Sequence, residues 1–186
     1  MAALSGALGV TLLSMVANYT LGKEKFKKVE DRIKKILIEL GDYLKSFTEL
    51  IQEDIQAYSK FSQVSQMPKG TPEEKEERAR FLQEALKEAS EVPLKVALFS
   101  FKVIQTTKEL LSTGNPNLVS DVGVGVIMAQ AALESAALNV EINLKYIKNT
   151  AFTKKKREKL ARILTRGTEI KEEVLEEVKK KISPSS

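Results

Sequence analysis

The chain has 186 residues, enough for one domain with a full hydrophobic core, and it combines 30 Lys and Arg with 25 Asp and Glu for a net charge of +5. It contains no Cys, His or Trp, which excludes disulfides, thiolate or imidazole metal sites, Cys nucleophiles and Ser-His-Asp triads. Any proton transfer therefore falls to Asp, Glu, Lys or Tyr, and the interleaved charges indicate solvated helix faces rather than a nucleic-acid surface.

The first 22 residues carry no charge, which raises the question of a signal peptide or a membrane span. No basic residue precedes the apolar run, and small or polar residues such as Gly9 and Asn18 interrupt it. We therefore predict a helix over Ala2–Leu21 that packs inside a bundle and ends at Gly22. The expected protein is cytoplasmic and has no membrane partner.

A second helix is predicted from the Lys-rich segment Lys23–Lys28 to about Ser65. Its apolar side chains form one stripe at helical spacing: Ile36, Leu40, Tyr43, Phe47, Leu50, Ile51, Tyr58 and Phe61. Asp54 lies in the middle of this stripe, whereas Glu53 points about 100° away, toward solvent. A carboxylate buried among aromatic side chains costs several kcal/mol unless it is paired or protonated. A buried ion pair with a Lys of another helix is one explanation, and we favour a functional carboxylate.

The third helix has the clearest start in the chain. Thr71-Pro72-Glu73-Glu74 is a capping box with proline at the first helical position, and the helix should continue to about Ser112. Pro93 interrupts it. Because proline has no N–H, it frees the carbonyl of Ala89, and we expect a kink there.

The segment Gly114–Asn143 is apolar or small on all sides after an Asn115-Pro116 start, which predicts a buried central helix. Its polar exceptions share one stripe: Asp121, Ser135, Asn139 and Asn143. Hydrogen bonds between packed helices are the alternative explanation for each of them. Asn149 or Thr150 should cap a fifth helix. The predicted fold is all-α, an up-and-down bundle of five long helices, with helix three kinked at Pro93.

Several phrases in this order resemble the formiminotetrahydrofolate cyclodeaminase and methenyltetrahydrofolate cyclohydrolase family. They cover almost the whole chain: SGALG (5–9), MVANYTLGK (15–23), EDIQAY (53–58), MPKGTPEEK (67–75), LQEALKEASEVPL (82–94), GNPNLVSDVGV (114–124) and ALNVEINLK (137–145). The resemblance implies one domain over 1–186, an all-helical homodimer, and tetrahydrofolate as substrate with no metal and no further cofactor. The family's Pro-containing, Gly-rich N-terminal loop is absent before SGALG, so no residue of that loop is carried over.

In that family the acidic residue of the D-x-x-A-[FY] phrase is catalytic, which implies that Asp54 is the catalytic residue here. The other matched phrases imply substrate binding by a set of polar residues: Asn18, Ser120, Asp121, Asn139 and Asn143. The anionic glutamate tail of a folate needs cations, and we expect Lys23, one helical turn beyond Asn18, to contact it.

The resemblance leaves two activities open, hydrolysis of 5,10-methenyltetrahydrofolate and cyclodeamination of 5-formiminotetrahydrofolate. We favour the cyclohydrolase because no formiminotransferase domain is attached, and a non-catalytic helical scaffold is the alternative from another class. Asp121 and Asn139 are separated by about 27 Å along one helix, which predicts a site shared between two subunits.

Overall fold

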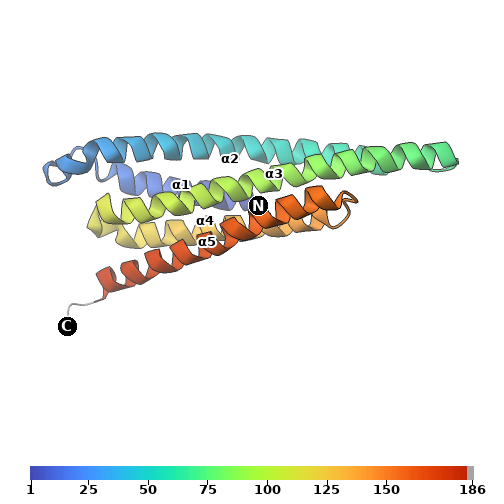
Figure 1. Cartoon of the computed structure of the whole chain (residues 1–186). Coiled ribbons are helices and arrows are strands. Elements are labelled where there is room, and N and C mark those ends of the chain that lie inside the picture. The colour runs from blue at the N-terminus through green and yellow to red at the C-terminus, as the bar shows by residue number, and fades with distance from the viewer. Residues whose placement is uncertain (184–186) are drawn as a thin grey trace.

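The computed structural model describes residues 1–183 as five α-helices joined by short turns. They are α1 (Ala2–Asn18), α2 (Glu30–Ser65), α3 (Pro72–Thr113), α4 (Val119–Leu144) and α5 (Thr150–Ile182), with 3₁₀ turns at Glu24–Val29 and Pro116–Leu118. Successive helices run antiparallel, and α2 and α3 form a long hairpin that projects beyond the other three (Figure 1). The predicted five-helix, up-and-down bundle is confirmed.

Helix boundaries follow the local signals. Thr71 and Glu74 form the expected reciprocal capping box, and the Asn149 side chain accepts a hydrogen bond from the N–H of Phe152. The second helix begins later than predicted, because Lys23–Lys28 belongs to a turn and the 3₁₀ helix rather than to α2. Gly22 has φ +69°, the left-handed conformation that suits glycine, but it follows the end of α1 by four residues.

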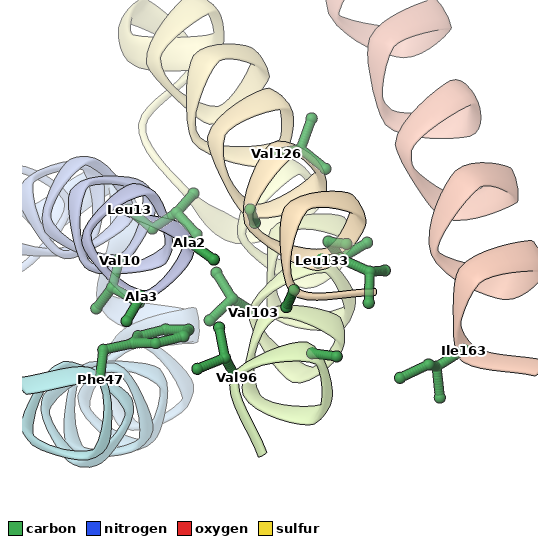
Figure 2. Packing of buried hydrophobic residues seen from close by; sticks show 14 of the residues in the cluster. Ala2, Ala3, Val10, Leu13, Phe47, Val96, Val103, Val126, Leu133 and Ile163 are labelled. Atoms are coloured by element: carbon green, nitrogen blue, oxygen red, sulfur yellow. The ribbon is translucent and has the colours of Figure 1, made fainter. Parts of the chain in front are cut away.

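All five helices contribute to one core of buried apolar side chains. Figure 2 shows the Phe47 ring of α2 lying between α2 and α1, close to Ala3, with Val96 and Val103 of α3 directed toward the same space. Phe47 and Val103 are fully buried. Small residues on α1 let the neighbouring helices approach closely, since a Cβ on Gly9 would lie 3.0 Å from the carbonyl oxygen of Gly125 on α4.

Gly6→Ala should destabilise the bundle by about 1–3 kcal/mol, because the added methyl group overpacks the core. An added Cβ would lie 2.5 Å from Cζ of the buried Phe47 ring. Gly41→Ala is the matched control in α2, where nothing lies within 4 Å of the added atom. That control should hold or gain stability through helix propensity. Thermal and urea unfolding of both variants measure the difference, and equal melting temperatures would contradict the packing argument.

The prediction that α4 is buried on every side is wrong. One face of this helix is open, and it exposes large apolar side chains: Val124 46%, Ile127 48%, Leu138 74% and Ile142 53%. The reason is that α1, α3 and α5 surround α4 on three sides only. Among the described residues, one stretch, Pro116–Leu144, is long and apolar enough to cross a membrane, judged by length and composition alone, and 56% of its most apolar window is buried in the bundle.

Candidate active site

Two adjoining depressions lie between α2, α3 and the end of α4, and they share Asp54 and Ile55 in their walls. The first has a volume of about 440 Å³ and is also lined by Tyr58, Phe61 and Asn143. The second, of about 220 Å³, reaches the start of α1 and is also lined by Pro93 and Asn139. Together they place one carboxylate, two carboxamides and aromatic side chains around one space. Such a mixture of apolar walls and few polar groups is typical of small-molecule sites.

The prediction that Asp54 is buried within the apolar stripe of the second helix is wrong. Its side chain is exposed, and the neighbouring Tyr58 is 73% exposed. The stripe is buried only as far as Leu50, where α2 passes the start of α1. Beyond that level α2 and α3 continue together as the projecting hairpin. Asp54 therefore lies on the face of α2 that α1 covers nearer the start of α2. At the level of Asp54 this face is open, so the side chain lines the pocket instead of the core.

Glu53, expected to point to solvent, is half-buried instead. It turns toward α3 and accepts a hydrogen bond from Lys95, with Nζ and Oε2 2.7 Å apart. Within residues 1–183 Asp54 has no ion pair of this kind. The two adjacent carboxylates therefore differ in their surroundings. The carboxylate of Glu53 is paired with Lys95 where α2 meets α3, whereas that of Asp54 is available to a ligand.

Asn143 is held at the pocket wall by two backbone carbonyls. Its Nδ2 donates to the carbonyl oxygen of Ala89 at 3.0 Å and to that of Asn139 at 3.1 Å. The sequence predicted that Pro93 frees the Ala89 carbonyl, but it gave no sign that Asn143 is the partner. Helix α3 continues unbroken through Pro93, and the kink itself stays a prediction.

The remaining predicted binding residues do not reach this pocket within one chain. Asn18 lies at the far end of α1, and Ser120 and Asp121 lie at the start of α4. Asp121 is about 27 Å from Asn139 along α4. Asn18 is exposed, and its Nδ2 donates to the Ser14 carbonyl at 2.9 Å. Lys23 is exposed in the turn beyond α1.

At this opposite end of the bundle, α1 and α4 are joined by buried hydrogen bonds that were not predicted from the sequence. The Thr20 hydroxyl accepts a hydrogen bond from the backbone N–H of Asn115 at 2.9 Å, and the Asn115 amide donates to the Tyr19 carbonyl at 3.4 Å. Both Thr20 and Asn115 are more than nine-tenths buried. The contact joins the end of α1 to the start of α4, so Asn18 and Ser120 are held at one level of the bundle.

A larger depression of about 690 Å³ near the hairpin is less suited to a folate. Its lining includes Glu73, Glu76 and Glu77 against Arg80 and Lys148, so it repels an anionic tail. Across residues 1–183 no three acidic side chains are placed to share a metal ion. The pocket at Asp54 is therefore the candidate site.

Comparison with known proteins places the chain in a family. Residues 1–162 match the formiminotransferase-cyclodeaminase family. The chain belongs to this family. A methenyltetrahydrofolate cyclohydrolase of Methylorubrum extorquens is 38% identical over 182 residues, which are 98% of this chain and 88% of that protein.

Other relatives in the family are longer proteins. The formimidoyltransferase-cyclodeaminase of Gallus gallus is 32% identical over 163 residues, which are 88% of this chain and 30% of that protein. The crystal structure of formiminotetrahydrofolate cyclodeaminase from Thermotoga maritima matches with a TM-score of 0.77 at 26% identity, over 97% of this chain and 84% of that one. The resemblance drawn from the sequence motifs is confirmed, and the relatives are folate-processing enzymes.

Proposed function

We propose that this protein is a methenyltetrahydrofolate cyclohydrolase, which hydrolyses 5,10-methenyltetrahydrofolate to 10-formyltetrahydrofolate at the pocket of Asp54. The observation that carries the proposal is the position of Asp54, a carboxylate without an ion pair in the described chain, in the wall shared by both depressions. The relative from Methylorubrum extorquens, which the match covers along 88% of its length, is a cyclohydrolase. This match favours hydrolysis over cyclodeamination.

The pocket offers the groups that this substrate needs. The methenyl substrate is cationic at its amidinium carbon, and a carboxylate attracts that charge. Tyr58 and Phe61 offer apolar and aromatic surface to the pterin ring, while Asn139 and Asn143 offer neutral hydrogen-bonding groups to its polar edge. The chain's own residues can therefore bind and orient the substrate, and we propose no further cofactor.

Asp54 can serve both proton transfers of the hydrolysis. As water adds to the amidinium carbon, the carboxylate accepts a proton from that water. The bond from this carbon to N5 then breaks, Asp54 returns its proton to N5, and the adduct's hydroxyl proton passes to solvent as the formyl carbonyl forms. One proton is released overall, which balances the loss of the substrate's positive charge.

Loss of the near-ultraviolet absorbance of 5,10-methenyltetrahydrofolate on mixing with the protein tests the proposal directly. The runner-up activity is cyclodeamination, favoured by the fold match to a formiminotetrahydrofolate cyclodeaminase. Ammonia release from 5-formiminotetrahydrofolate, without hydrolysis of the methenyl compound, would support that activity instead. A protein inactive on both substrates would be a helical scaffold.

We also propose a homodimer formed through the open face of α4. Six exposed residues of α4 lie in pairs at equal distances from Ala131: Ser120 and Ile142, Val124 and Leu138, Ile127 and Ser135. In an antiparallel pair of α4 helices crossing at Ala131, Val124 would oppose Leu138 and Ser120 would oppose Ile142. This spacing would allow the face to pair with a second copy of itself about a two-fold axis. The exposed Leu4 and Leu8 of α1, which packs beside α4, extend it.

This arrangement would complete the site from two chains. The two-fold rotation about Ala131 brings the end of α4 that carries Asn139 and Asn143 to the other subunit's Ser120 and Asp121. Asn18 lies at the same level as Ser120, since the contact of Thr20 with Asn115 joins the two segments. The residues that stand about 27 Å apart in one chain would then face one pocket.

Lys23→Gln should raise the Michaelis constant about two- to fivefold for a polyglutamylated substrate and less for the monoglutamate, because Lys23 would meet the anionic tail beyond Asn18. Turnover should stay level, and high salt should reproduce the effect in the wild-type protein. Lys159→Gln, an exposed lysine on α5, is the control and should change neither substrate's constant. Equal effects of Lys23→Gln on both substrates would place the tail elsewhere.

A further inference from the structure

Pro93 lies buried inside α3, a helix that runs without a break from Pro72 to Thr113. Proline has no N–H, so the carbonyl of Ala89, four residues earlier, receives no helical hydrogen bond. The proline ring also pushes that carbonyl away from the helix axis. Ala89 is half-buried, so its carbonyl needs another donor.

The donor is the carboxamide of Asn143 on α4, which bonds Ala89 at 3.0 Å and the carbonyl of Asn139 at 3.1 Å. Both partners are backbone carbonyl oxygens, which can only accept. The atom that faces the two carbonyls must therefore be the nitrogen of the carboxamide, and both of its N–H groups are hydrogen-bonded. The oxygen Oδ1 accepts no hydrogen bond from residues 1–183, and Asn143 lines the pocket beside Asp54.

We propose that Pro93 is a positioning residue, which through the free carbonyl of Ala89 holds Asn143 with its oxygen toward the pocket as an acceptor for an N–H of the substrate's pterin ring. The proposal rests on the proposed function. An amide whose nitrogen is committed in this way cannot donate to the pterin carbonyl, so it favours the ring edge that carries amino and ring N–H groups. Binding in one orientation follows, with the reacting carbon on a defined side relative to Asp54.

A double-mutant cycle tests whether Pro93 affects substrate binding through Asn143. Pro93→Ala restores the N–H at position 93, so the Ala89 carbonyl turns back into the helix, and melting temperature should hold or rise. The Michaelis constant should nevertheless rise about three- to tenfold, the range of one neutral hydrogen bond, with turnover within about twofold of wild type. Asn143→Ala should give a similar rise, and the double variant no more than either single one.

Pro93 also lines the second depression, so a direct contact with substrate is the competing explanation. In that case the effects of Pro93→Ala and Asn143→Ala would multiply, which would overturn the positioning role. A loss of thermal stability that accompanies the change in the Michaelis constant would overturn it too, because it would indicate a purely structural proline.

NMR of the unliganded protein decides the orientation of Asn143 without reference to activity. Both carboxamide protons of Asn143 should exchange slowly in the wild-type chain, because both are bonded to carbonyls, and at least one should exchange faster in Pro93→Ala. Equal exchange in the two proteins would overturn the inference. If the wild-type chain hydrolyses no folate but this difference is present, the proposed function fails and the positioning of Asn143 stands.

Discussion

Asp54→Asn should lower the turnover of 5,10-methenyltetrahydrofolate by about a thousandfold, within the range expected for loss of a general acid and base. The carboxamide keeps the shape of the side chain but cannot accept the proton of water. Because Asp54 is exposed and has no ion pair in the described chain, stability should change by no more than about 0.5 kcal/mol. Absorbance assays and thermal unfolding of the same preparation separate the two effects.

Glu53→Gln is the matched control for this prediction. It makes the same chemical change one residue earlier, where the carboxylate pairs with Lys95 across the seam of α2 and α3. A pair between half-exposed side chains contributes at most about 1 kcal/mol to stability, so the variant should fold. Its turnover should stay near the wild-type value, because Glu53 does not line the pocket of Asp54. Loss of activity in Glu53→Gln with retention in Asp54→Asn would reverse the assignment of the two carboxylates.

If the protein forms the proposed dimer, Ala131→Glu should convert it to monomers and remove most of the activity at the same protein concentration. Ala131 is exposed at the centre of the proposed interface of α4, so two glutamates would meet at the proposed two-fold axis. Burying that pair of like charges should weaken dimerisation on the order of a hundredfold or more. Sedimentation and turnover measured over a dilution series should then show that activity follows the dimer.

Ala161→Glu, at an exposed position of α5 away from this face, is the control and should leave both assembly and activity unchanged.

Mixing two impaired variants tests the shared site more sharply. Asp54→Asn and Asp121→Asn subunits, unfolded and refolded together, should regain about a quarter of wild-type activity, because half of the dimers would carry one intact site of two. A monomeric wild-type protein with full activity, or no recovery on mixing, would refute the shared site.

The sequence alone determined most of the helix boundaries and the identity of the family. Thr71 with Glu74 and Asn149 with Phe152 are local contacts within one turn, so their spacing was sufficient to place α3 and α5. The up-and-down order followed because short links between long amphipathic helices allow little else. Asp54 was singled out twice, by its position among apolar residues and by the family phrase that contains it.

Only the tertiary structure decided what surrounds these residues. The stripe of α2 has one period throughout, yet Phe47 is buried and Asp54 is exposed, because burial depends on where α1 begins beside it. In the same way α4 is apolar on every side, yet one side is left uncovered by the other helices of residues 1–183. The bond of Asn143 to Ala89 joins residues 54 positions apart. Helical period predicts which residues share a face, whereas the length and packing of neighbouring helices determine what that face meets.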